Sequence, residues 1–97
     1  MDATSVTKTN AVLRAKISGH SYNSGFFYGT SKNEVVNLTS GKKGFGVETN
    51  YDHTVTCNMN TEAKVTLKSK TTYYYRAFAV GADGKTYTGD VKQFTTP

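Results

Sequence analysis

Tryptophan is absent from this chain of 97 residues, and cysteine and proline each occur once. A single cysteine, Cys57, excludes an internal disulfide. It also excludes a zinc site built on several cysteines, and the two histidines, His20 and His53, lie far apart in the sequence. Without tryptophan, the seven tyrosines and five phenylalanines supply the large aromatic side chains.

Long apolar runs and dense charge are also missing. No stretch approaches the roughly 18 apolar residues that span a bilayer, and the first residues lack the basic start and apolar centre of a signal peptide. The formal charge is +5, from 12 lysines and arginines against 7 acidic residues, but only Lys42 and Lys43 are adjacent. Scattered cations favour a solvated surface over a nucleic-acid site, where cations cluster on one element.

The length predicts one domain, which we assign to residues 1–97. A chain of this size buries roughly 60–65% of the surface that its unfolded form exposes, which supports one modest core and no deep catalytic cavity. We expect the domain to be excised from a longer protein, with Met1 an added start and Pro97 a natural point of division before a linker.

The run 71–80 has the strongest strand pattern, because β-branched and aromatic residues fill most of it. Residues 81–85 predict a turn, and a second strand-like run follows to the end of the chain. Together the two runs predict a hairpin that closes an all-β domain. Alternation sorts the first run into two faces, with Tyr73, Tyr75, Ala77 and Ala79 on one and Tyr74, Arg76, Phe78 and Val80 on the other.

Elsewhere, alternating apolar and polar residues predict further short strands, and no segment keeps a helical period for the length of a helix. The segment 11–17 alternates well, with every second residue from Ala11 to Ile17 pointing inward. A short edge strand at 3–9 and a loop or wide hairpin at 40–46 are also expected. The remaining strand candidates are 22–31, 34–39, 47–59, 62–68 and 86–94. Seven or so short strands with turns between them are typical of a β-sandwich.

The last strand candidate contains a spacing conflict. Val91 and Phe94 are three residues apart, so a regular strand cannot turn both side chains inward. We therefore predict either a β-bulge near residues 89–92 or an outward Val91. Unbroken pairing with both side chains buried would contradict this prediction.

Four segments carry a more specific pattern: Gly25-Phe26-Phe27-Tyr28-Gly29-Thr30-Ser31, then Leu67, then the run 72–79, then Phe94-Thr95-Thr96-Pro97. Together they resemble a bacterial subgroup of fibronectin type III-like domains, which occur in tandem arrays of secreted and surface-anchored proteins, often lipoproteins. The resemblance implies an immunoglobulin-like Greek-key sandwich of about seven antiparallel strands. It also implies that Tyr73 is the tyrosine corner, with its ring buried and its hydroxyl bonded to nearby backbone.

The chain departs from the ordinary family pattern in two places. The buried tryptophan of ordinary members is absent, which fits the bacterial subgroup. The usual Pro-Gly pair before the Thr-Tyr motif is replaced by Lys68-Ser69-Lys70-Thr71. This replacement predicts a shorter or differently built corner.

Candidate reactive residues are few. We interpret His20 and His53 as exposed loop histidines and Cys57 as a small buried hydrophobe, because neither metal-ligand spacing nor a nearby base accompanies them. The loop 41–46 lacks the Gly-Lys-Ser/Thr ending and the helix of a phosphate cradle, and it predicts a hairpin turn. No Ser/His/Asp arrangement or carboxylate pair is recognisable. We therefore expect no enzyme activity, no cofactor and no metal.

One aromatic set remains as a candidate ligand platform: Tyr74, Phe78 and Tyr87. Tyr74 and Phe78 share a strand face, and Tyr87 lies in the other strand of the expected hairpin. Aromatics exposed on a sheet stack on sugar rings or join another protein. Lateral packing between neighbouring strands is the favoured alternative for the same residues.

The resemblance implies a non-catalytic spacer or interaction module of a larger bacterial protein. The expected location is extracellular or on the cell surface, where a lipoprotein anchor outside this segment would hold it. Expected partners are neighbouring domains of the same chain and a protein or glycan, without nucleic acid and without a membrane span in this segment. The alternative function is a carbohydrate-binding or accessory domain of a polysaccharide-acting enzyme.

Overall fold

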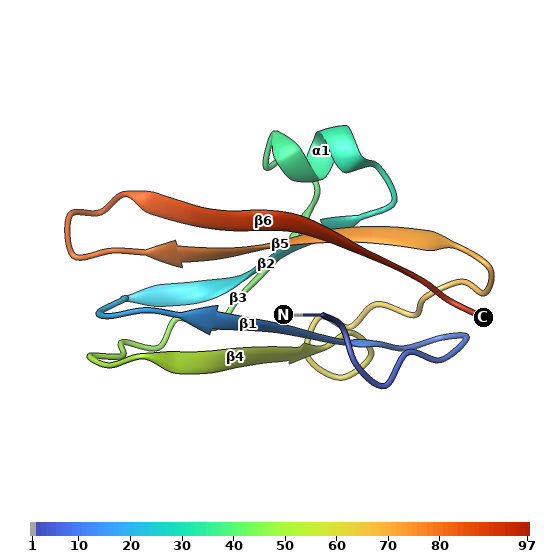
Figure 1. Ribbon diagram of the computed structural model, residues 1–97, viewed down its shortest axis with the longest axis horizontal. Helices are drawn as coiled ribbons and strands as arrows, with labels where there is room; N and C mark the ends of the chain where they lie inside the picture. Colours follow the sequence, from blue (N-terminus) through green and yellow to red (C-terminus); the bar gives the residue numbers. More distant parts are fainter. Residues whose placement is uncertain (1) are drawn as a thin grey trace.

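Two antiparallel sheets form the molecule as a sandwich of two layers (Figure 1). The computed structural model describes residues 2–97. The smaller sheet pairs β1 (Val12–Ile17) with β4 (His53–Asn58). The larger sheet has the order β3 (Gly41–Gly44), β2 (Asn23–Gly29), β5 (Thr72–Val80) and β6 (Thr86–Thr95). The expected two-sheet, mostly β sandwich is confirmed, and one short helix, α1 (Lys32–Val36), is added to it.

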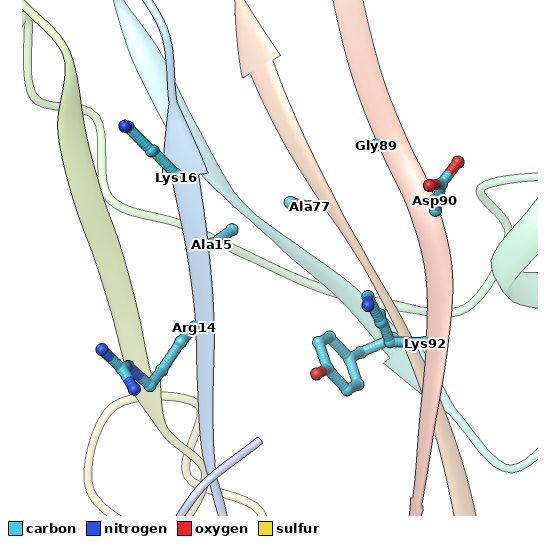
Figure 2. A pocket seen from close by; sticks show the side chains of 8 residues that line it. Arg14, Ala15, Lys16, Ala77, Gly89, Asp90 and Lys92 are labelled. Carbon is cyan, nitrogen blue, oxygen red and sulfur yellow. The ribbon is translucent and has the colours of Figure 1, made fainter. Parts of the chain in front are cut away.

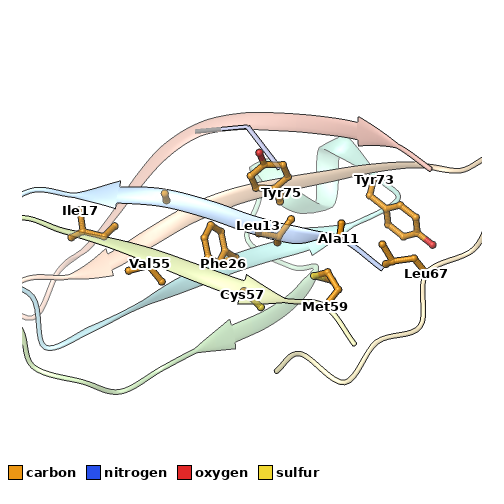
Figure 3. Close-up of a cluster of buried hydrophobic side chains, with 11 residues drawn as sticks. Ala11, Leu13, Ile17, Phe26, Val55, Cys57, Met59, Leu67, Tyr73 and Tyr75 are labelled. Carbon is orange, nitrogen blue, oxygen red and sulfur yellow. The ribbon is translucent and has the colours of Figure 1, made fainter. Parts of the chain in front are cut away.

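The core lies between the two sheets because β1, β2, β4 and β5 turn apolar side chains into this space (Figure 3). The expected alternation in β1 is confirmed, since Leu13 is completely buried and Lys16 is exposed. Cys57 on β4 pairs with Leu13 and is also completely buried, as expected of a small hydrophobe. Phe26 of β2 meets Tyr75 of β5 edge to face, with ring centroids 6.2 Å apart. The buried cluster consists of Ala11, Leu13, Ala15, Ile17, Phe26, Val55, Cys57, Met59, Leu67, Tyr73 and Tyr75.

The outer face of the larger sheet has its own apolar cover. Phe78 is only 1% exposed, and its ring centroid lies 5.2 Å from that of Phe27 on the neighbouring strand. The ammonium group of Lys42 sits above both rings, 4.9 Å from the centroid of Phe78 and 5.7 Å from that of Phe27. A cation above an aromatic face is attracted to the ring, so Lys42 stays over these two side chains. Phe78 is therefore shielded on the outer face of β5, as Tyr75 is on the inner face.

The strand expected at 34–39 is wrong, because these residues begin inside α1. The side chain of Ser31 caps the helix by accepting a hydrogen bond from the backbone N–H of Glu34. Ser-x-x-Glu is the capping-box sequence, and Val35 is the residue that the helix buries. The guanidinium of Arg76 on β5 donates to the carbonyl of Val36, at 3.1 Å, where a cation suits the helix C-terminus.

Two other segments differ from expectation. The expected loop or hairpin at 40–46 contains β3, which pairs with β2 so closely that a Cβ on Gly25 would lie 1.8 Å from the carbonyl oxygen of Lys43. The edge strand expected at 3–9 is reduced to one bridge between Thr4 and Val12. Both segments are short and mostly polar. Whether they form a strand therefore depends on which strand lies next to them in space, and not on an apolar pattern of their own.

The strand expected at 62–68 does not form either, although Leu67 points into the core. The side chain of Asn60 holds this segment by donating to the carbonyls of Thr9 and Val65, each at 2.8 Å. The apolar residues of the segment thus pack against the core without forming a strand. Hydrogen bonds from Asn60 hold the segment in place of a strand partner.

The three-residue spacing of Val91 and Phe94 in the last strand is accommodated by a β-bulge, as predicted. Gly89 and Asp90 of β6 together oppose Ala77 of β5, which makes a β-bulge inside the predicted range 89–92. Val91 pairs with Arg76 on the outer face, whereas Phe94 pairs with Tyr73 on the inner face. The side chain of Arg76 donates to the carbonyl of Gly89 at 2.7 Å and so holds the bulge.

Candidate functional site

The expected aromatic platform is not assembled. Phe78 is buried beneath Lys42 and is therefore unavailable to a ligand. Tyr87 pairs with Ala79, so its side chain lies on the inner-face side of the hairpin, opposite to Tyr74. The Tyr87 hydroxyl donates to the carboxylate of Asp83, which raises the pKa of Tyr87 and lowers that of Asp83. The prediction that Tyr74, Phe78 and Tyr87 form one surface is wrong, because the strand pairing separates them.

The two histidines have ordinary partners. The imidazole Nε2 of His20 lies 2.9 Å from a carboxylate oxygen of Glu48. His53 is the first residue of β4 and not a loop residue, and its Nδ1 lies 3.0 Å from the carbonyl of Tyr51. Within residues 2–97, no group of three or more histidine, cysteine or acidic side chains is placed to hold a metal ion.

Tyr73 is held in place between the sheets by contacts of both its ring and its hydroxyl group. Its ring is buried and stacks on Phe94, with centroids 5.6 Å apart, and its hydroxyl accepts a hydrogen bond from the backbone N–H of Lys68 at 2.8 Å. The hydroxyl of Thr96, to which the sequence analysis gave no separate role, donates to the carbonyl of Lys68 and accepts from the N–H of Thr71. The connection that enters β5 is therefore held by Tyr73 of β5 and by Thr96, the residue that follows β6.

β1 is incompletely paired on the side that faces away from β4. Val12 exchanges two backbone hydrogen bonds with Thr4 on this side, each 2.9 Å long. Hydrogen-bonding direction alternates along an antiparallel strand, so the backbone groups of Arg14 and Lys16 point the same way as those of Val12. In the part of the chain that the structure describes, no strand lies against Arg14 and Lys16 on this side.

A groove follows this open edge between β1 and β6 (Figure 2). Its larger part has a volume of about 320 Å³, and a second part of about 240 Å³ continues it towards Ser18. In Figure 2, Ala15 and Ala77 face the gap, whereas Arg14 and Lys16 project away from β6. Small side chains at these positions are what leaves the groove open. The larger part is lined by Arg14, Ala15, Lys16, Tyr75, Ala77, Gly89, Asp90 and Lys92.

The charge around the groove is mostly positive. Arg14, Lys16 and Lys92 supply three cations among the lining residues, against one carboxylate from Asp90. Lys92 also lies 3.7 Å from the carboxylate of Asp2, and both side chains of this pair are well exposed. Exposed ion pairs of this kind contribute little to stability, but the carboxylate of Asp2 offsets part of the positive charge of Lys92.

The chemistry of the groove is suited to binding and offers no reactive centre. The nearest thiol, Cys57, is enclosed in the core, and burial raises its pKa to about 11, with the charge of Glu62 adding to the effect. A thiol of this kind is almost entirely protonated at neutral pH and is a poor nucleophile. The sequence carried no signal for the groove, because outward charged residues such as Arg14 and Lys16 are typical of any strand with one solvated face.

No protein-family model, no curated protein and no solved structure matches this chain. No helix in residues 2–97 is long and apolar enough to cross a membrane.

Proposed function

We propose that the chain is a non-catalytic module of the fibronectin type III-like class, which serves as a spacer and interaction unit in a larger secreted or surface-exposed bacterial protein. The observation that carries the proposal is the hydrogen bond from the Lys68 N–H to the Tyr73 hydroxyl. In immunoglobulin-like sandwiches, a tyrosine near the start of a late strand bonds to backbone a few residues upstream, at the corner where the chain crosses between sheets. Tyr73 occupies the second position of β5, directly after such a crossing from β4.

The strand order supports the same proposal. β1 and β4 share one sheet, whereas β2, β3, β5 and β6 share the other, so the chain crosses between layers from β1 to β2, from β3 to β4, and from β4 to β5. Crossings of this kind are those of a Greek key. We expect such a sandwich to resist extension as one unit, because three of its connections cross between the sheets.

A spacer sets distance by staying folded under load. The molecule is 39 Å along its longest axis, whereas 97 residues of extended chain would span about 330 Å. A folded module therefore keeps an attached domain close to its anchor, and an unfolded one releases it by nearly 300 Å, which is the difference between these two lengths.

The test is single-molecule force extension of the chain tethered at its two ends. We expect one cooperative unfolding step with a gain of about 300 Å in contour length, together with full refolding on release. Gradual extension without a step would contradict a spacer role. Protease accessibility of the parent protein on intact bacterial cells tests the proposed location, and protection until lysis would contradict it.

A further inference from the structure

We propose that the free edge of β4 pairs with the same edge of a second copy of this chain. The smaller sheets of the two copies then form one continuous antiparallel sheet across the dimer. This inference deepens the interaction role proposed above and rests on it, because it names the partner of the module. The pairing is symmetric about Val55 and joins Thr54 of each copy to Thr56 of the other.

One side of β4 has open backbone groups. Val12 makes backbone hydrogen bonds on the side of β1 that faces away from β4. Because hydrogen-bonding direction alternates along an antiparallel strand, Leu13 bonds towards β4, where Cys57 is its partner. Thr54 and Thr56 therefore direct their N–H and C=O groups away from β1. Among residues 2–97, no strand lies against these groups.

The two ends of β4 fix the register of the pair. At the end of the strand, the backbone N–H of Asn58 donates to the carboxylate of Glu62 at 3.0 Å, and the C=O of Asn58 accepts from the N–H of Glu62 at 2.9 Å. The strand begins at His53, so the open groups belong to Thr54 and Thr56. Pairing Thr54 with Thr56 of the other copy uses all of these groups in hydrogen bonds between the copies.

The segments that border this edge lie inside the chain. The bridge between Thr4 and Val12 directs the first residues along the opposite side of β1. At the other terminus, the carbonyl of Pro97 accepts a hydrogen bond from the N–H of Lys70, outside β4. The edge of β4 is therefore open independently of the residue at which the sequence begins.

The outward side chains of β4 favour a second copy as the partner. Thr54 and Thr56 are exposed and uncharged, and β4 contains no lysine, proline or bulge, which are common protections of an edge. In the symmetric register, threonine meets threonine on the outer face, and Val55 meets Val55 on the inner face. Cross-strand pairs of this kind are favourable, whereas Arg14 and Lys16 would oppose the same pairing along β1.

Complementary groups meet at the two ends of the pair. The same register places Asn58 opposite Asp52 of the other copy. The side-chain Oδ1 of Asn58 accepts from the N–H groups of Asn60 and Thr61, which leaves the NH₂ group of Asn58 as a donor. The carboxylate of Asp52 accepts from the N–H of Gly19 at 2.7 Å and has capacity for more. A hydrogen bond from amide to carboxylate at each end therefore supports this register.

Tyr51 extends the contact with apolar surface. It lies shortly before β4, its side chain is 69% exposed, and its ring centroid is 6.3 Å from that of His53. In the dimer, this ring lies beside the turn that follows β4 in the other copy. A single strand pair is smaller than a standard interface of roughly 1,200 Å² or more. We therefore expect a weak dimer that dissociates on dilution.

The assembly closes at two copies. Each copy has one β4 edge, and a symmetric contact uses it once. Other edges are protected, because β3 carries Lys42 and Lys43, and β6 carries the bulge at Gly89 and Asp90. The expected product is therefore a dimer and not a growing chain of copies.

The first experiment is sedimentation velocity of the full chain from low micromolar to millimolar concentration. A reductant is present, so that no disulfide forms through Cys57. We expect a reversible shift from monomer to dimer and no larger species. A chain that stays monomeric throughout this range would overturn the proposal, as would assemblies that grow without limit.

Amide hydrogen exchange, resolved by residue, identifies the edge that pairs. The amides of Thr54 and Thr56 should exchange about tenfold or more slowly at millimolar than at low micromolar concentration. The amides of Val55 and Cys57 face β1 and should be slow at both concentrations, which makes them the internal control. A dimer in which the amides of Thr54 and Thr56 stay fast would place the contact elsewhere and contradict the proposal.

Matched lysine variants test the same pairing through the side chains. Thr54→Lys/Thr56→Lys brings like charges together across the pair, and it should weaken the dimer by about tenfold or more. Thr86→Lys/Thr88→Lys adds the same charge at exposed residues of β6 and should leave the dimer unchanged. Equal weakening by both variants, or by neither, would overturn the proposal. A chain that unfolds in one step under force but never dimerises would sink this inference and leave the spacer role standing.

Discussion

The edges of β1 and β6 border the same groove, but they are built differently. β6 is ten residues long and carries a bulge at Gly89 and Asp90, which Arg76 holds by a hydrogen bond. β1 pairs with β4 in unbroken register on one side. On its other side, β1 forms an isolated bridge at Val12 with Thr4. The β6 edge is thus protected by an irregular backbone, whereas the positive charge of Arg14 and Lys16 disfavours pairing of the β1 edge with a second β1 edge.

The largest expected effect lies in the anchoring of β1. Leu13 is completely buried between the sheets, so Leu13→Ala removes packing and leaves a cavity. We expect a loss of about 3–5 kcal/mol in the free energy of unfolding, measured by chemical denaturation. Phe94→Ala on β6 should cost less, about 2 kcal/mol, because Phe94 is only partly buried. A larger cost at Phe94 would break the view that β1 is the more deeply anchored edge.

The second prediction concerns Cys57, which lies on β4, the strand that covers one side of β1. Since burial raises the pKa of this thiol to about 11, the native chain should react with a thiol reagent at pH 8 about a hundredfold more slowly than the unfolded chain. Equal rates in the two states would show that β4 does not enclose the thiol.

The same thiol gives stability a pH dependence with a definite sign. The folded state holds the Cys57 proton more tightly than the unfolded state, so this contribution is fully present below pH 8.5 or so and falls as pH rises towards 11. Comparing denaturation of the chain with that of Cys57→Ala over this range separates the thiol from the lysines. A difference that grew with pH in favour of the native thiol would contradict the argument.

The fourth prediction concerns the corner that joins the two layers. Tyr73→Phe keeps the ring on Phe94 but leaves the Lys68 N–H without its acceptor. We expect a loss of about 1 kcal/mol or slightly more, measured by thermal or chemical denaturation. The matched variant Tyr74→Phe lies outside the corner and should be close to neutral. Unchanged stability of Tyr73→Phe would argue against the corner.

The smallest expected effect on monomer stability comes from replacing the exposed cations of β1, and this change tests most directly how the two edges differ. Arg14→Thr/Lys16→Thr removes the two cations without touching the core, so stability should change by less than about 0.5 kcal/mol. The same variant should self-associate further than the unaltered chain, as measured by sedimentation at increasing concentration, because like charges no longer separate two β1 edges. A variant that associates no further than the unaltered chain at millimolar concentration would show that charge is not what guards this edge.

The sequence predicts the strands that bury one face. β1 is recovered because burial on a single side leaves a period of two, and β5 is recovered because β-branched and aromatic residues fill most of it. The bulge follows from the three-residue spacing of Val91 and Phe94. The helix α1 is missed because five residues are too few for a helical period, although the capping sequence from Ser31 to Glu34 was readable.

The remaining differences have a common physical cause. The alternation at 62–68 is genuine, but the side chain of Asn60 fixes that segment where a strand partner would otherwise be needed. The platform fails because strand pairing puts Tyr87 beside Ala79, away from Tyr74. The open edge of β1 also depends on pairing, because alternation along one strand does not say which strands lie beside it.

Amide hydrogen exchange along β1, resolved by residue, tests the central claim most directly. The amides of Leu13, Ala15 and Ile17 face β4 and should exchange slowly, whereas those of Arg14 and Lys16 face the groove and should exchange orders of magnitude faster. Uniform protection from 13 to 17 would mean that the edge is already paired. Uniformly fast exchange would mean that the smaller sheet does not form, and either result would contradict the account.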